Sequence, residues 1–364
     1  MIHFFIFGRN PILSYVELVS YLESNKIEYK EITVQNNFFL AEFDDSVNFD
    51  IQNFGGVIKI GKVRIVGSFK EFTDYIHANE LVEKDKFTYS VIGNMEDDLF
   101  TEKFKKEKRK AIIRRGRKQL KLESGDSITI PSAEVEFFCY EHERKFYFGL
   151  VDQDYSYSEI KERDMKKPVR RESLAISPRL AKILINLSKV RKGELLLDPF
   201  CGIAGVLQEA LILGLNVYGI DKDPRAIEDA RKNLKWLEGK YEIKASYKLL
   251  NADAKNTPNI KFDGVATEPA LGETFRHKPK DKEAKIVIES FERMIIGVLQ
   301  RLKVLKKPNA RIVFIAPYIR NFSIDIKKVC NQTKLTQLNI QDIKFPIRES
   351  REDQFISREV HILV

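Results

Sequence analysis

The sequence is poor in the residues that build disulfide frameworks and metal clusters. Its 364 residues include only three cysteines and five histidines, which are widely spaced and form no Cys-x-x-Cys pair. A disulfide scaffold is therefore excluded, and we expect no metal site. No apolar run approaches the roughly twenty residues that cross a bilayer, and the first residues lack the basic lead of a signal peptide. We therefore expect a soluble, cytoplasmic protein that does not bind a membrane.

Glycine and proline are also scarce, at 18 and 12 residues, which excludes collagen-like and low-complexity chains. Hydrophobic residues make up 43% and charged residues 32%, a globular composition. The length predicts two or three domains. We expect domains over residues 1–60, 61–155 and 177–364, with a charged linker over 156–176.

Positive charge is concentrated in one short stretch. The formal net charge is +9, and residues 103–118 alone carry ten basic side chains against one acid. A second cluster, residues 161–171, holds six basic side chains against two acids. Such concentration is typical of proteins that neutralise phosphates; the alternative is a solvated lysine-rich surface. The predicted contacts of the first stretch are Lys105, Lys106, Arg109, Arg114, Arg115 and Arg117.

The order of apolar runs predicts two kinds of architecture. Up to residue 155, short strands and helices predict an α+β region, with a helix over 14–22 that has Ser14 as its N-cap. A basic helix or helix-turn is expected over 102–120. From Ser177 onward, strands alternate regularly with helices, which predicts an α/β domain with a mostly parallel sheet and helices on both faces.

A ligand loop is predicted at residues 198–205, Asp-Pro-Phe-Cys-Gly-Ile-Ala-Gly, between an apolar strand and a helix. Gly202 and Gly205 permit a tight turn and close approach of a ligand, and the helix start offers free N–H groups. The loop lacks the three-glycine dinucleotide spacing, which favours a ligand without a pyrophosphate. Asp221 ends the next strand, where an acid can bind ribose hydroxyls.

Asp253 follows the third strand, where an acid can bind an adenine amino group. The order of these residues on consecutive strand ends predicts an S-adenosylmethionine site. The predicted cofactor-binding residues are Asp198, Phe200, Gly202, Ala204, Gly205, Asp221, Lys222, Asp253 and Ala254.

At these residues the chain resembles the class I S-adenosylmethionine-dependent methyltransferases. It also resembles the THUMP-containing tRNA guanosine N2-methyltransferases that act on guanosine 10. That resemblance is carried by the loop at 198–205, by Phe7–Pro11, by the lead-in 163–171 with 177–181, and by Gly219–Asp223.

The resemblance implies a Rossmann-like methyltransferase domain behind an N-terminal ferredoxin-like domain and a THUMP domain whose basic stretch grips tRNA. It further implies that Asp198 and the turn 202–205 hold the methionyl end of the cofactor, that Asp221 holds the ribose and that Asp253 holds the adenine. Whether a partner subunit is required stays open.

Amino-directed methyltransferases usually carry Asp/Asn-Pro-Pro-aromatic after the fourth strand. Acceptors there bind the N–H groups of a weakly nucleophilic amine, and the ring stacks on the extruded base. Here the run is Thr267-Glu268-Pro269-Ala270-Leu271-Gly272, so Thr267 stands in place of Asp or Asn and Ala270 in place of the ring. We predict Thr267, Glu268 and Pro269 as catalytic residues, with Glu268 as the acceptor and Phe275 as the stacking surface.

Two alternatives remain beside this hypothesis. One is a protein that binds cofactor and tRNA but transfers methyl groups poorly or not at all; for Glu268 alone, the structural alternative is a surface loop acid paired with Lys278 or Arg276. A DNA amino-methyltransferase is the other alternative, which the basic THUMP-like segment disfavours.

Overall fold

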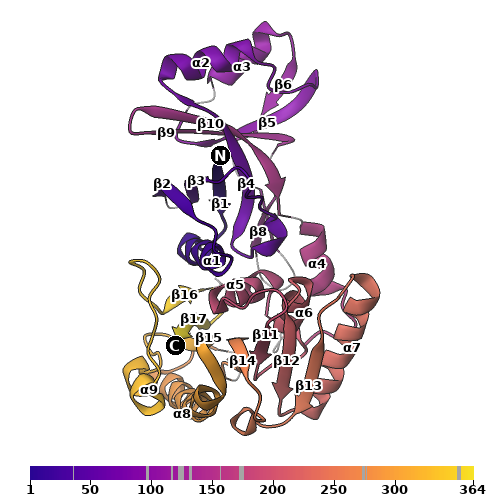
Figure 1. Ribbon diagram of the computed structural model, residues 1–364, viewed down its shortest axis with the longest axis vertical. Coiled ribbons are helices and arrows are strands. Elements are labelled where there is room, and N and C mark those ends of the chain that lie inside the picture. The colour runs from indigo at the N-terminus through magenta and orange to yellow at the C-terminus, as the bar shows by residue number, and fades with distance from the viewer. Residues whose placement is uncertain are drawn as a thin grey trace.

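The structure is a computed structural model with two layered halves stacked along its long axis (Figure 1). It describes residues 1–35, 37–95, 98–115, 118–121, 127–130, 133–155, 157–171, 176–272, 275, 277–350 and 354–364, with backbone only for 118–121 and 127–130. The N-terminal half forms the upper part of the view, and helices α1 (Pro11–Ser24) and α5 (Pro178–Ser188) lie where the halves meet.

The N-terminal half is built on one mixed sheet with the strand order β2-β3-β1-β4-β10-β9-β5-β6 among the described residues. These strands are β1 (Ile2–Phe7), β2 (Tyr29–Gln35), β3 (Phe38–Phe43), β4 (Val57–Gly67), β5 (Lys86–Gly93), β6 (Lys110–Ile113), β9 (Val135–His142) and β10 (Lys145–Asp154). The other elements are α2 (Phe69–Ala78), α3 (Asp98–Lys106), α4 (Tyr157–Met165) and the pair β7 (Lys118–Lys121) and β8 (Ser127–Ile130).

Strand β4 spans the boundary that the sequence places at residue 60. It pairs with β1 through residues 57–62 and with β10 through residues 59–67. One sheet therefore runs through both expected N-terminal domains, and the division into a ferredoxin-like and a THUMP domain stays a prediction.

Helix α1 begins earlier than expected, because Asn10 rather than Ser14 is its N-cap. The Asn10 side-chain oxygen accepts a hydrogen bond from the Leu13 N–H at 3.1 Å, and Pro11 occupies the first helical position. The Ser14 hydroxyl instead donates to the backbone oxygens of Asn10 and Gly56, inside the helix. The prediction of Ser14 as N-cap was wrong.

The basic stretch is not one helix over 102–120. Helix α3 ends at Lys106, and Lys108 adopts a left-handed backbone with φ of 56°. The following residues, with Ile112 and Ile113 among them, form β6, which pairs in parallel with β5. β-Branched isoleucines favour a strand over a helix, and this local preference outweighs the charge pattern.

The C-terminal half has the strand order β13-β12-β11-β14-β15-β17-β16. Neighbours are parallel from β13 to β15, whereas β17 pairs antiparallel with both β15 and β16. This confirms the predicted mostly parallel sheet. Its strands are β11 (Leu195–Asp198), β12 (Asn216–Asp221), β13 (Tyr247–Asn251), β14 (Phe262–Thr267), β15 (Lys306–Ile319), β16 (Ile347–Glu349) and β17 (Ile356–Leu363).

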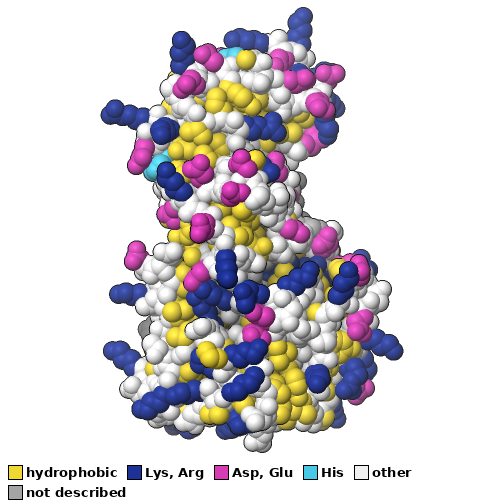
Figure 2. Space-filling view, in the orientation of Figure 1, with side chains coloured by type: hydrophobic (Ala, Val, Ile, Leu, Met, Phe, Trp, Pro, Cys, Tyr) yellow, Lys and Arg dark blue, Asp and Glu magenta, His cyan; other side chains and the backbone are white. Residues whose placement is uncertain are grey.

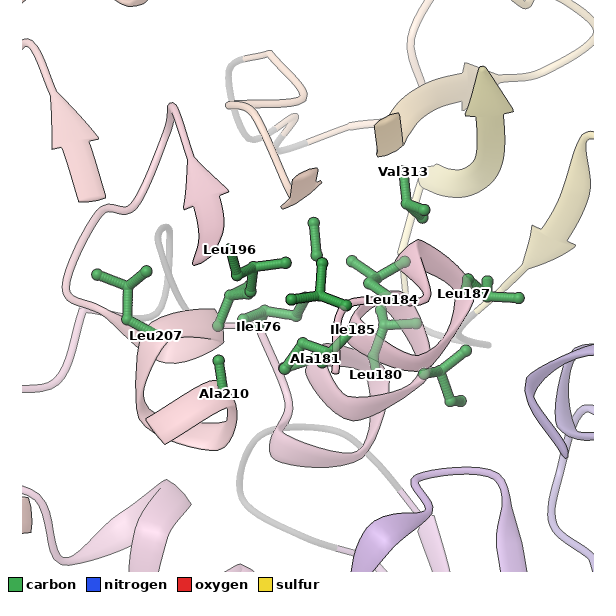
Figure 3. Packing of buried hydrophobic residues seen from close by; sticks show 14 of the residues in the cluster. Ile176, Leu180, Ala181, Leu184, Ile185, Leu187, Leu196, Leu207, Ala210 and Val313 are labelled. Atoms are coloured by element: carbon green, nitrogen blue, oxygen red, sulfur yellow. The ribbon is translucent and has the colours of Figure 1, made fainter. Parts of the chain in front are cut away.

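Helices cover both faces of this sheet, as its buried strands require. Helices α5, α6 (Gly205–Ile212) and α7 (Pro224–Lys240) share one apolar cluster with β11 and β12, whereas α8 (Asp281–Leu305) and α9 (Ile326–Thr333) share another. Figure 3 shows Leu184 and Leu187 of α5 packed toward Val313 of β15, with Leu196 of β11 beside them.

The first cluster also joins the two halves of the molecule. It includes Leu13, Val16 and Val19 of α1, so α1 packs on α5 through a shared apolar surface. At the centre of this contact is the fully buried carboxylate of Glu17. It accepts hydrogen bonds from the backbone N–H groups of Gly55 and Gly56, at 2.7 and 2.6 Å, and from the side-chain amide of Asn186 on α5, at 2.8 Å.

We predict that Glu17→Ala lowers the free energy of unfolding by about 3 kcal/mol, because three buried donors lose their acceptor. Chemical denaturation followed by circular dichroism measures the change. The matched variant Glu28→Ala removes an exposed carboxylate from the same half and should alter stability by less than about 0.5 kcal/mol. Equal effects of the two substitutions would contradict a structural role for Glu17.

Candidate active site

A cavity of about 620 Å³ lies at the carboxyl ends of β11, β12 and β14. Between β11 and β14 the strand order reverses, and open α/β sheets bind ligands at such a point. Its size suits a small-molecule site. The predicted residues that line it are Asp198, Phe200, Gly202, Gly205, Asp221, Lys222, Asp253, Ala254, Glu268, Pro269 and Phe275.

Asp198 ends β11 and is 1% exposed. Its Oδ1 atom accepts hydrogen bonds from the Thr267 hydroxyl at 2.6 Å and from the Phe200 N–H at 3.1 Å. Burial raises the pKa of Asp198 to about 7, and the nearby carboxylates of Asp221 and Glu268 add to the rise against the opposing effect of the two hydrogen bonds. The group therefore changes charge near neutral pH.

The loop after β11 is held by the acid that ends β12. The Asp221 side chain accepts the N–H of Gly202 at 3.0 Å and the N–H of Asp223 at 2.9 Å. Gly202 and Ala204 both have positive φ, 50° and 72°, and only the glycine adopts this conformation without strain. Ala204 is buried under the loop and does not line the cavity.

Asp253 and Ala254 lie on the neighbouring side of the cavity, after β13. The Asp253 side chain caps the short helix 254–256 by accepting the Lys255 N–H at 2.8 Å. The structure thus brings the predicted residues of three strand ends together, because carboxyl ends of parallel strands meet at one edge of the sheet.

Thr267 and Glu268 occupy different environments. Thr267 is 2% exposed and directs its hydroxyl to Asp198, so it does not reach the cavity. Glu268 is the first residue after β14 to line the cavity, followed by Pro269, Ala270 and Leu271. In the run 267–272, called the acceptor run below, the part that lines the cavity starts at Glu268, one residue later than the motif alignment expects. In this register, Leu271 stands where the motif has an aromatic ring.

Within the described residues, Glu268 is ion-paired with Arg358 rather than with Lys278. Its Oε1 atom accepts from Nε of Arg358 at 2.5 Å, and the two side chains are 12% and 10% exposed. Arg276 lies outside the described residues. The alternative of a solvent-exposed surface acid is therefore wrong for Glu268.

The sequence analysis missed the segment 354–358, which also lines the cavity. It enters β17, which pairs antiparallel with β15 about 90 residues after the acceptor run. Only the pairing of β17 beside β15 brings Arg358 to Glu268, and no motif in the chain signals this.

The basic stretch is partly exposed and partly structural. Lys105, Lys106, Arg114 and Arg115 are exposed, and Arg117 lies outside the described residues. Arg109, by contrast, is 13% exposed and binds Glu80, Glu107 and the backbone oxygens of Val82 and Lys84. Its guanidinium holds the turn after α3, which disfavours a phosphate contact at Arg109, and that role stays a prediction. Figure 2 shows lysine and arginine side chains around the end of the molecule that carries α2, α3 and β6.

The second basic cluster is partly exposed and partly buried, because Lys161, Lys166 and Arg170 are exposed whereas Arg163 and Lys167 are buried. Arg163 of α4 is 2% exposed and its Nε atom donates to Glu209 of α6 at 2.7 Å. Lys182 of α5 lies 3.7 Å from the same carboxylate, and Arg171 pairs with Asp223 and Asp229. At Arg163 and Arg171, acids distant in sequence already neutralise the charge, which disfavours the expectation that these two residues neutralise phosphates.

Comparison with known proteins gives three kinds of match. A methyltransferase domain family described as RMKL-like, UPF0020, matches residues 168–295. The tRNA (guanine(10)-N2)-dimethyltransferase of Pyrococcus abyssi is 30% identical over 179 residues, 48% of this chain and 51% of that protein. Its counterpart from Methanocaldococcus jannaschii is 28% identical over 214 residues, 57% of this chain and 59% of that protein.

A third relative with the same name, from Methanothermobacter thermautotrophicus, is 38% identical over 99 residues, which cover 27% of this chain and 28% of that protein. The chain thus spans about half or less of the length of these relatives. The crystal structure of TrmN from Thermus thermophilus has the same fold along the whole chain, with a TM-score of 0.56, 14% identity and coverage of 100% and 99%.

Fold and site together define the C-terminal half as a class I, Rossmann-like methyltransferase domain. Over about half of its length the chain is similar to tRNA (guanine(10)-N2)-dimethyltransferases, and residues 168–295 match a methyltransferase domain family. Across the described ranges, no helix is long and apolar enough to cross a membrane. Nor do these residues gather three or more histidine, cysteine or acidic side chains into a cluster that could hold a metal ion.

We predict that affinity for S-adenosylmethionine rises roughly tenfold between pH 6 and pH 8, because the ionised Asp198 carboxylate attracts a cationic ligand. The stability of the ligand-free protein should change in the opposite direction. Because the pKa of Asp198 is raised in the folded state, its protonated form stabilises the fold at low pH, and this contribution is lost as the pH rises through 7. Calorimetric titration across this pH range measures the effect.

Asp198→Asn should bind more weakly and without this pH dependence, whereas Asp253→Asn should retain the dependence. An affinity of the unmodified protein that does not change between pH 6 and pH 8 would rule out titration of Asp198.

Proposed function

We propose that this protein transfers a methyl group from S-adenosylmethionine to the exocyclic N2 amine of guanosine 10 in tRNA. The observation that carries the proposal is the cavity at the ends of β11, β12 and β14, where a ligand loop and an amine acceptor face the same space. The names of the relatives from Pyrococcus abyssi and Methanocaldococcus jannaschii support the choice of substrate and position.

The chemistry of the cavity fits the cofactor. The residues that line it include Asp198, Asp221 and Asp253, and negative charge on their carboxyl groups suits a ligand with an ammonium and a sulfonium group. Gly202 leaves the loop backbone open to close approach. Asp198 would hold the methionyl end, Asp221 the ribose and Asp253 the adenine edge, each by accepting hydrogen bonds. When bound, S-adenosylmethionine supplies the electrophilic methyl group.

The acceptor run supplies what the amine requires. An exocyclic guanine amine is a weak nucleophile, so an oxygen that accepts its N–H as charge develops lowers the barrier. Glu268 presents a carboxylate at the cavity wall, and Pro269 restricts the backbone behind it. The amine nitrogen gains the methyl group and releases one proton, for which we propose the Glu268 carboxylate as the acceptor.

The exposed basic residues Lys105, Lys106 and Arg114 are suited to capture of the substrate. They lie on α3 and just after β6, in the half of the molecule away from the cavity. Contacts there would hold tRNA through its phosphates, while a separate part of the same molecule enters the cavity. The proposal includes a THUMP domain in the N-terminal half and the binding of tRNA by that domain.

We predict methyl transfer from labelled cofactor to a tRNA transcript with guanosine at position 10 and none to the same transcript with inosine there, because inosine lacks the 2-amino group. Glu268→Ala should reduce the rate of transfer by roughly 100-fold or more, while cofactor affinity stays within about twofold. Nucleoside mass spectrometry locates the product.

The matched variant Glu289→Ala removes an exposed carboxylate from α8 and should retain full activity. Full activity in Glu268→Ala would refute the assignment of the acceptor. Binding of cofactor and tRNA without transfer to any tRNA would instead support the non-catalytic alternative.

We further predict that Lys105→Ala/Lys106→Ala weakens tRNA binding and lowers the salt slope, by about one per lost phosphate contact, because fewer counterions are released. Filter binding at several salt concentrations measures the slope. The control Lys235→Ala/Lys248→Ala removes the same charge from exposed sites on the C-terminal half. Identical slopes for both variants would assign residues 105 and 106 to a merely solvated surface.

A further inference from the structure

The mouth of the cavity carries an exposed aromatic ring that the motif analysis does not explain. Phe355 is 47% exposed, although most large apolar side chains in the described ranges are buried. It lines the cavity together with Gln354, Ile356 and Arg358 of the same segment. A phenylalanine kept at the mouth of a ligand cavity is suited to contact a flat, apolar face of a ligand.

The acceptor run offers no ring of its own. After Glu268 and Pro269 come Ala270, Leu271 and Gly272, none of which can stack on a base. Two other rings reach the cavity, those of Phe200 and Phe275. Both are partly buried and pack against the apolar cluster beneath α8, so they already contact the core.

Phe355 is held close to the acceptor by its own strand. Arg358, three residues further on, pairs with Glu268 at 2.5 Å, and its Nη1 atom donates to the Gln354 side-chain oxygen at 3.1 Å. Phe355 lies in the chain between Gln354 and Arg358, whose side chains are held by these contacts. Phe355 therefore belongs to the same cavity-lining segment as the arginine that binds the Glu268 carboxylate.

The N-terminal half forms hydrogen bonds with the end of β16, the strand that pairs with β17. Arg9 donates to the Glu349 side chain at 2.5 Å and to the Ser350 backbone oxygen at 2.7 Å. The Asn10 side chain donates to the Arg348 backbone oxygen and to Glu349, both at 2.8 Å. Because β16 pairs with β17 in the register Glu349 to Arg358, these contacts connect the Phe7–Pro11 motif to the cavity wall.

We propose that Phe355 is the stacking surface for the extruded guanine, in place of the aromatic residue missing from the acceptor run. The inference rests on the proposed function. With the base stacked on Phe355, its amine edge faces Glu268, so one strand supplies the ring and fixes the acceptor. Phe275, predicted from the sequence for this role, then belongs to the core that supports the wall.

The test compares Phe355→Ala, Phe355→Leu and Phe355→Tyr in single-turnover methylation of the tRNA transcript with guanosine 10. We expect kcat/KM to fall roughly 10- to 100-fold in the alanine variant, by the loss of one base–aromatic stack. Tyrosine should restore it and leucine should not, because only tyrosine has a π face. Cofactor affinity should stay within about twofold in all three.

A second readout does not depend on turnover. A transcript with 2-aminopurine at position 10 should be quenched on binding the unmodified protein and should be brighter with Phe355→Ala. Phe69→Ala, at an exposed phenylalanine of α2 outside the cavity (56% exposed), serves as the matched control and should behave like the unmodified protein in both assays.

The outcomes separate the two proposals. If the unmodified protein methylates no guanosine 10, the proposed function fails and this inference falls with it. If it does methylate guanosine 10 but Phe355→Ala retains its kcat/KM, or leucine rescues as well as tyrosine, only the role of Phe355 is overturned.

Discussion

The contact between α1 and α5 is the constraint on which the rest of the molecule depends. The Glu17 carboxylate is buried there and accepts three N–H groups, two from the Gly55–Gly56 turn and one from Asn186 of the other half. A Cβ atom on Gly55 would lie 2.0 Å from the Arg179 backbone oxygen, so the turn must lack side chains. Separation of the halves would expose the apolar residues around Glu17 to water. The cost of that exposure holds the N-terminal sheet in place over the C-terminal half.

The packing of α4, α5 and α6 also decides which basic side chains stay exposed to solvent. The linker's Arg163 is buried against Glu209, which Lys182 approaches as well, so this charge serves the contact between α4, α5 and α6. The lysines at 105 and 106 are exposed. Basic residues that look alike in the sequence thus have different environments, because burial beside a carboxylate removes Arg163 from solvent.

The same docking reaches the cavity through the β16–β17 pair. Arg9 and Asn10 bind the end of β16, and Arg358 of β17 binds Glu268. The Phe7–Pro11 motif therefore has a structural explanation: Asn10 caps α1, and Arg9 and Asn10 bind the end of β16 next to one wall of the site. The N-terminal and C-terminal halves are therefore positioned relative to each other in part by contacts at this strand pair.

Much of the site could be predicted because it depends on local order. Asp198, Asp221 and Asp253 each follow a strand, and parallel strands place their carboxyl ends at one edge whatever the loops between them. Residue roles that depend on distant partners could not be predicted. Thr267 proved to bind Asp198 rather than face the cavity, and the helix expected over 102–120 gave way to a strand at Ile112 because β5 was available as a partner.

The amino-acid sequence by itself determined the alternation of strands and helices, the convergence of three acids on one sheet edge and the absence of a ring after Glu268, since each follows from residues near one another in the chain. Only the tertiary structure decided that Arg358 pairs with Glu268, that Phe355 lies at the cavity mouth and that Arg109 and Arg163 are occupied. Those outcomes depend on which surfaces are buried together, and burial is a property of the folded chain as a whole.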